Sequence, residues 1–346
     1  MKAWIIIICL LLCLAVPASA ADLTAPEAPD SARPLLPYEE VSFAEGLRHI
    51  VSKAFEVVFP SVSQALRVCI SVFAAVMLIG LLRCVGDGAA GAVSLCVAVV
   101  IGCILLEPAN SMIRAASETV GELSDYGKLL LPVMTAALAA QGGGGSAAAL
   151  YAGTALFDTL LSSAVTKLLA PVVYIFLALA VMAAATGDES LQRLKRAILT
   201  FISKGLRVVL YIFTGYLTIT GVVAGTADQM SVKAAKLTIS GMVPVVGNIM
   251  AEASETLLVS AGLLKSAAGV YGLLTVIAIG ISPFLRIGIQ YLLLKATAAA
   301  GSMFESKEVT GLVNDFASAM GLLLAMTGAQ CMLILVSTVC FMKGMG

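Results

Sequence analysis

Long apolar runs follow one another through most of this 346-residue chain, and they restrict how it can fold. Hydrophobic residues make up 60% of the chain and charged residues only 12%, about half of the charged fraction usual in a soluble domain. Backbone polar groups in lipid must be paired within their own segment, so these runs predict membrane helices. The expected fold class is all-α: a polytopic transmembrane helical bundle with re-entrant or broken helices and amphipathic surface helices.

The N-terminus has the features of an exported chain. Residues 1–20 are predicted to be a secretory signal peptide, with a positive start, an apolar core and an A-x-A site that ends at Ala20. An uncleaved first span is the alternative. Residues 21–62 are then expected outside the cytoplasm, as a proline-rich extended linker and an amphipathic helix over 43–60 that ends at its proline. A multi-span membrane domain is expected to occupy 63–346.

Two crossings and a second surface helix are expected next. Residues 68–82 are predicted to cross the membrane and 89–106 to return. Glu107-Pro108 is expected to begin an amphipathic helix on the outer surface, because apolar residues after it face one way and charged residues the other.

Two later stretches are predicted to interrupt the membrane helices. Residues 129–169 are interpreted as a broken or re-entrant hairpin, with two short tilted spans as the alternative. Residues 238–269 combine glycine and proline with charges, which at membrane depth usually face a bundle interior or a pathway. An extracytoplasmic loop with its charges in water is the alternative there. The candidate conduit or subunit-contact residues of the two stretches are Pro132, Pro244, Gly247, Asn248, Glu252, Glu255 and Lys265.

The strongest positive cluster lies in 187–207. Its basic residues are Arg193, Lys195, Arg196, Lys204 and Arg207. By the positive-inside rule the segment is cytoplasmic. An apolar stripe predicts a helix on the inner leaflet, with Asp188 as its N-cap. This helix is the candidate docking face for a cytoplasmic partner.

The same rule gives a topology for the rest of the chain. Arg83, the 187–207 cluster, Arg286 and Lys343 are all expected inside. The acidic balance of 301–318 suits the outside.

A duplication is a further hypothesis. Pro132 and Pro171 are 39 positions apart, as are Pro244 and Pro283, which suggests related halves over 128–230 and 240–342. Chance matches in a sequence rich in Ala, Leu and Val are the alternative.

Several chemistries have no support in the sequence. The chain contains no P-loop motif, no CxxC pair and a single histidine, so we expect no enzyme activity, no metal and no cofactor. A formal net charge of zero gives no basic surface for nucleic acid.

The region from 240 to 300 resembles the stage III sporulation protein AE family of endospore-forming bacteria. The motifs that carry the resemblance are GMVPVVG at 241–247, EASET at 252–256, LLKSAAG at 263–269, PFLR at 283–286 and Lys295-Ala296.

This resemblance implies a multi-pass cell-membrane protein in the mother-cell half of the complex that joins mother cell and forespore. The implied role is a permease-like or export-platform subunit. The implied partners are other membrane subunits of that complex, its cytoplasmic ATPase and the lipid bilayer. A stand-alone secondary transporter of a small solute is the main alternative, and a pure assembly scaffold is the third.

Overall fold

The computed structural model describes residues 25–37, 42–85, 90–140, 144–219, 267–304 and 307–344. The expected signal peptide lies outside these residues, and so does most of the interrupted stretch at 238–269. The candidate residues outside the described part are Pro244, Gly247, Asn248, Glu252, Glu255 and Lys265.

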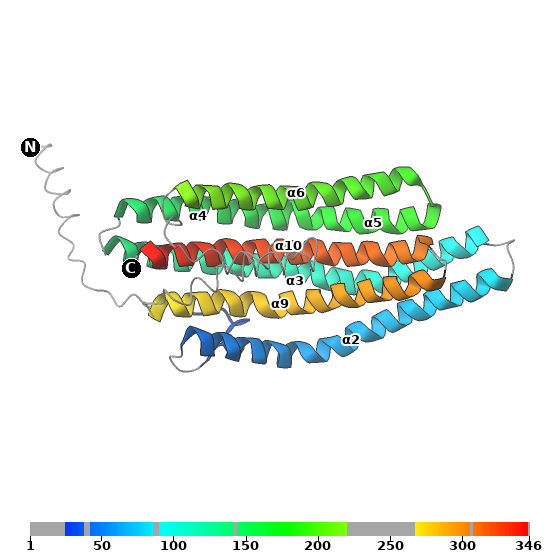
Figure 1. Ribbon diagram of the computed structural model, residues 1–346, viewed down its shortest axis with the longest axis horizontal. Helices are drawn as coiled ribbons and strands as arrows, with labels where there is room; N and C mark the ends of the chain where they lie inside the picture. Colours follow the sequence, from blue (N-terminus) through cyan, green and yellow to red (C-terminus); the bar gives the residue numbers. More distant parts are fainter. Residues whose placement is uncertain are drawn as a thin grey trace, which may run out of the picture.

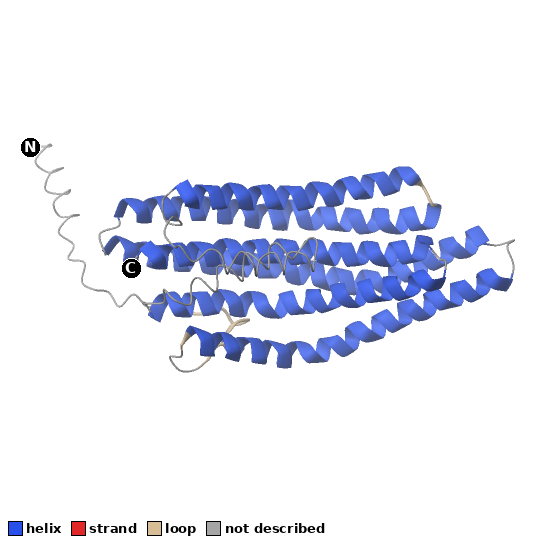
Figure 2. Cartoon of the chain, in the orientation of Figure 1, coloured by secondary structure: helices blue, strands red, loops and turns tan. Residues whose placement is uncertain are grey.

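The described chain is a bundle of long helices (Figures 1 and 2). These helices are α2 (Phe43–Val85), α3 (Ala90–Ala140), α4 (Gly144–Ala164), α5 (Ala170–Thr186), α6 (Glu189–Ile219), α9 (Ala267–Gly301) and α10 (Lys307–Gly344). A π-helical turn, η3 (Val165–Leu169), joins α4 to α5, and the 3-10 turns η1 (Arg33–Leu35) and η4 (Ser302–Phe304) complete the described elements. Six segments of this part are long and apolar enough to cross a membrane, and no strand occurs in it. The all-α, multi-pass class is therefore confirmed.

Successive long segments run antiparallel along one axis. The last turns of α2, α5 and α9 lie at the same end as the first turns of α3, α6 and α10 (Figure 1). We call this the α5–α6 end of the bundle, and the opposite one the α3–α4 end.

Helix α10 lies at the centre of the bundle. It contacts α3, α4, α5, α6 and α9, and nearly all residues of its most apolar stretch are buried. Residues 316–342 carry no charge and are apolar around the whole circumference of the helix, which is the pattern of an enclosed helix.

Three prolines do not end or break their helices as predicted. Pro60 lies inside α2, and Pro108 and Pro132 lie inside α3. The predicted helix end at Pro60, the new helix at Glu107-Pro108 and the break at Pro132 are therefore wrong. The chain does reverse between α3 and α4, as the predicted hairpin requires. A proline removes one backbone hydrogen bond, which a long packed helix can absorb by bending, and α2 bends visibly in Figure 1.

The proline-rich N-terminal segment is folded against the bundle where it is described. Ala28, Ala32 and Leu35 are buried, and Ser31 donates a hydrogen bond of 2.8 Å to the Glu122 carboxylate of α3. The predicted extended linker is therefore wrong for residues 25–37, because its small apolar side chains find a surface to cover.

The predicted topology needs correction at two places. Lys195 of α6 and Asp315 of α10 form an ion pair, so 187–207 and 301–318 lie at the same end of the bundle and not on opposite sides. Lys343 is in the last turn of α10, at the α3–α4 end, away from the cluster that it was expected to accompany. The assignment of 301–318 to the outer side failed because it took Asp315 for a solvated loop residue, whereas Asp315 is largely buried and paired with Lys195.

A glycine allows α4 and α6 to approach closely. A Cβ built on Gly153 would lie 2.1 Å from Cε1 of Tyr216. The Tyr216 ring is held in place, because its hydroxyl donates a hydrogen bond of 2.7 Å to the carbonyl of Ala149. The Phe157 and Phe213 rings pack edge to face beside it, with centroids 5.3 Å apart.

We predict that Gly153→Ala lowers the stability of the protein in detergent by about 1–3 kcal/mol, because the methyl group must displace the Tyr216 ring. Thermal unfolding of the purified protein measures the change. Gly145→Ala on the same helix is the control, since Gly145 has no atom within 4 Å of an added Cβ. Equal melting temperatures for the two variants would contradict the close approach.

Candidate docking face and buried polar cluster

Helix α6 begins at a well-defined cap and packs along the bundle. The backbone N–H of Ser190 donates a hydrogen bond of 2.7 Å to Oδ1 of Asp188, which confirms Asp188 as the N-cap. Gly187 ends α5 at a φ of 70°, so the chain reverses within two residues. The helix then continues to Ile219 and packs along α4, α5 and α10. The prediction of a separate surface helix is wrong, because the segment is the start of one continuous helix whose later residues Leu206, Leu210 and Phe213 are buried in the bundle.

The outward side of α6 combines an apolar stripe with basic residues, and we call it the α6 outer face. Its exposed apolar members are Leu194, Phe201, Val208 and Ile212. Its exposed basic members are Arg193, Arg196, Lys204 and Arg207. None of these basic residues forms an ion pair with another described residue, so their charges are available to a partner. The face suits a surface in which carboxylates flank an apolar strip.

The fifth predicted docking residue lies on the opposite side of the helix. The side chains of Lys195 and Asp315 are only 12% and 13% exposed, and they pair with each other. Lys195 therefore attaches α6 to α10 and does not belong to the α6 outer face. A cavity of about 390 Å³ opens beside the pair, between α5, α6 and α10. Its polar lining includes Gln192, Asn314 and Ser318.

A buried carboxylate lies between α3, α4 and α10. Asp158 of α4 is 1% exposed and accepts a hydrogen bond of 2.7 Å from the Ser124 hydroxyl of α3. Gln330 of α10, which is fully buried, donates its amide N–H to the other carboxylate oxygen. The amide oxygen of Gln330 has no partner among the described residues. A charge-bearing group in this setting is rare in membrane helices and must be held by its neighbours.

A second buried contact lies on the same pair of helices. The Thr154 hydroxyl of α4 donates a hydrogen bond of 3.1 Å to Ser337 of α10, and both residues are fully buried. Together with Asp158 and Gln330, it joins α4 to α10 at two levels. No three His, Cys, Asp or Glu side chains of the described chain lie close enough to hold a metal ion.

Of the predicted conduit residues, the structure describes only one. Pro132 is exposed on α3, and the remaining conduit candidates lie outside the described residues. Sequence inspection could single out Asp158 as a charge in an apolar run. It missed Gln330 as its partner, because the two are 172 positions apart.

The stage III sporulation protein AE family model matches residues 38–344. The chain belongs to this family. The match covers α2 to α10, so it includes the α6 outer face and the buried cluster alike. The resemblance based on the motifs in 241–296 is thereby confirmed.

A curated relative agrees with this assignment. The chain is 22% identical over 175 residues to stage III sporulation protein AE of Bacillus subtilis (strain 168). That match covers 51% of this chain and 44% of the relative's length. No solved structure matches the chain. This family member is therefore a multi-pass sporulation protein, and neither comparison names a transporter.

The Lys195–Asp315 pair gives a stability prediction. Lys195→Met should lower the free energy of unfolding by about 3 kcal/mol or more, because it leaves the Asp315 carboxylate buried without a cation. The double variant Lys195→Met/Asp315→Leu should recover most of the loss. Thermal unfolding in detergent measures both, and Arg193→Met, at an exposed position, is the control. Additive losses in the double variant would contradict the pairing.

Proposed function

We propose that this protein is a membrane subunit of the complex that joins the mother cell to the forespore, in the mother-cell membrane, with a permease-like or export-platform role. The family assignment over residues 38–344 is the observation that carries the proposal. Its partners are other membrane subunits of the complex and the cytoplasmic ATPase. The protein itself is not an enzyme in this proposal.

The α6 outer face supports a role in assembly. It places four large apolar side chains, from 48% to 67% exposed, beside four basic residues that form no ion pair with a described residue. Apolar side chains alone would suit contact with lipid. The row of basic residues beside them favours instead a partner surface with acidic residues. We assign it to contact with another subunit that carries acidic residues.

The conduit is assigned to the region that the family motifs cover. Pro244, Gly247, Asn248, Glu252, Glu255 and Lys265 are the proposed lining or subunit-contact residues, and Pro132 accompanies them on α3. The support is the composition of the segment from Pro244 to Lys265, which combines helix-breaking residues with charges in an apolar context.

We predict that reversing charge on the α6 outer face prevents assembly. In an endospore-forming host, Arg193→Glu/Arg196→Glu should reduce copurification of the other membrane subunits about tenfold or more and lower spore yield, since attraction becomes repulsion. Quantitative mass spectrometry of the tagged protein measures the recovery.

The matched control is Arg48→Glu, which reverses an exposed charge on α2 outside the α6 outer face. It should leave recovery and spore yield unchanged. Normal recovery of partners with the α6 variant would refute the assembly role of this face.

The conduit assignment makes a separate prediction. Glu252→Ala and Lys265→Ala should lower spore yield while the protein still copurifies with its partners, because a lining charge acts after assembly. Spore counts and partner recovery are measured together. A pure scaffold predicts normal spore yield for both variants, and a stand-alone transporter predicts solute uptake by the purified protein alone in liposomes.

A further inference from the structure

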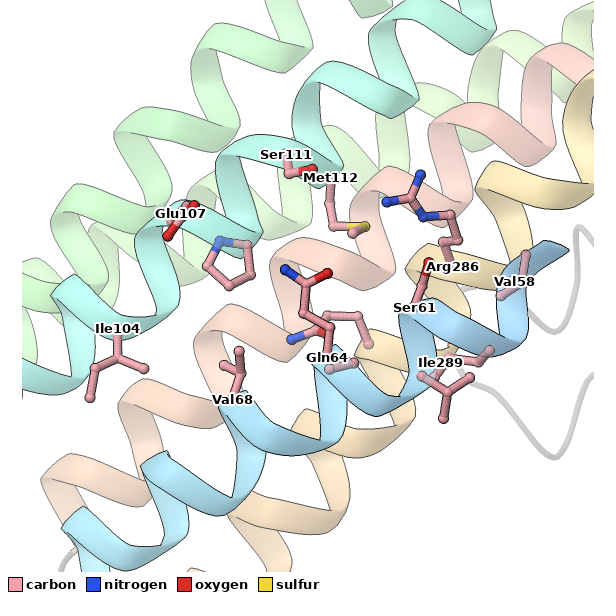
Figure 3. A pocket seen from close by; sticks show the side chains of 14 residues that line it. Val58, Ser61, Gln64, Val68, Ile104, Glu107, Ser111, Met112, Arg286 and Ile289 are labelled. Carbon is pink, nitrogen blue, oxygen red and sulfur yellow. The ribbon is translucent and has the colours of Figure 1, made fainter. Parts of the chain in front are cut away.

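A cavity of about 200 Å³ lies between α2, α3 and α9 (Figure 3). Its walls combine apolar side chains, such as Val68, Ile104 and Ile289, with a group of polar ones. The polar lining consists of Ser61, Gln64, Glu107, Ser111, Arg286 and Gln290. This site is separate from the α6 outer face and shares no residue with the Asp158 cluster, although α3 contributes to both.

The polar groups of this cavity lack partners in the described chain. Gln290 is only 3% exposed, lines the cavity, and its amide nitrogen makes no hydrogen bond. Leaving such a buried donor unpaired is unfavourable unless something else accepts its hydrogen bond. Arg286 and Glu107 are exposed, and neither pairs with a described residue. In Figure 3 they lie on opposite sides of the cavity, with Gln64 between them.

The cavity is in a wall of the bundle that has large exposed apolar side chains. On α2 these side chains are Phe55, Phe59, Leu66 and Ile70, each at least 46% exposed. In a multi-pass protein such a surface faces lipid acyl chains. A ligand held in the cavity would therefore have a polar part inside and an apolar part along α2.

We propose that this cavity binds the headgroup of an aminophospholipid, with the phosphate against Arg286 and Gln290 and the ammonium against Glu107. An arginine and an amide N–H are suitable donors for a phosphate. A carboxylate across the cavity accepts hydrogen bonds from a primary ammonium. One cation and one anion in the cavity match a headgroup that carries one charge of each sign.

The same arrangement discriminates between headgroups. A choline headgroup has no N–H to donate to Glu107, and a glycerol headgroup leaves that carboxylate without a cation. The cavity should therefore select phosphatidylethanolamine over phosphatidylcholine and phosphatidylglycerol.

The test is lipid retention by the full-length protein in detergent. The delipidated protein is exposed to an equimolar mixture of the three lipids, repurified, and its bound lipid is quantified by mass spectrometry. The wild type should be enriched in phosphatidylethanolamine. Arg286→Gln should reduce retention of all three about tenfold or more, since it removes the charged phosphate contact. Glu107→Gln should retain phospholipid but lose the preference for the ethanolamine headgroup.

Matched controls are Arg114→Gln and Glu118→Gln, which change exposed charges further along α3 and do not line the cavity. They should bind lipid like the wild type. Gln290→Leu should also lower retention, while the melting temperature of the delipidated protein stays the same or rises. This variant keeps the test decisive if Arg286→Gln fails to fold.

Two outcomes would overturn the proposal. One is wild-type lipid bound in the proportions of the mixture, or bound equally by the cavity variants. The other is displacement by soluble phosphoethanolamine as effective as displacement by short-chain phosphatidylethanolamine, because the apolar wall would then contribute nothing.

Discussion

The enclosure of α10 is the constraint on which the rest of the structure depends. Its uncharged stretch, 316–342, is covered on every side by α3, α4, α5, α6 and α9. In water the hydrophobic effect would drive this enclosure, but among membrane helices lipid tails are as apolar as the side chains. Close packing and specific polar contacts must therefore decide where each neighbour lies. A built Cβ on Gly280 of α9 would lie 2.4 Å from the Cys331 sulfur of α10, so the absence of a side chain there permits this packing.

The polar residues of α10 divide into two groups with different consequences. Thr327 and Thr338 donate to carbonyls one turn earlier on their own helix, which satisfies these donors without a neighbour. Ser337 donates in the same way and also accepts from Thr154 of α4. Gln330 and Asp315 instead contact Asp158 of α4 and Lys195 of α6. A buried polar group without its partner is strongly unfavourable, so these two contacts fix the register of α4 and α6 more narrowly than apolar packing could.

The sequence predicted the helical class because apolar runs in lipid allow little else. The ends of the helices were harder to predict. In the sequence, Pro60, Pro108 and Pro132 look like residues that end a helix. Helices α2 and α3 nevertheless continue through them, because they pack against other helices that are distant in the sequence. Charge counting identified the basic residues of α6. It could not separate Lys195 from the others, because its partner Asp315 is 120 positions away. The same distance problem hid the partner of Asp158.

The longest helices are longer than a membrane is thick, so parts of their surface must lie outside the hydrocarbon layer. At 51 residues, α3 extends about 77 Å, well beyond a hydrocarbon layer of about 30 Å. Two of the helices around the cavity carry a charged residue in its lining, Glu107 on α3 and Arg286 on α9. Charged residues at one level on neighbouring helices are what the boundary of a bilayer would impose. Phospholipid headgroups lie at that boundary, so the level of the charges and the unpaired amide of Gln290 favour the same occupant.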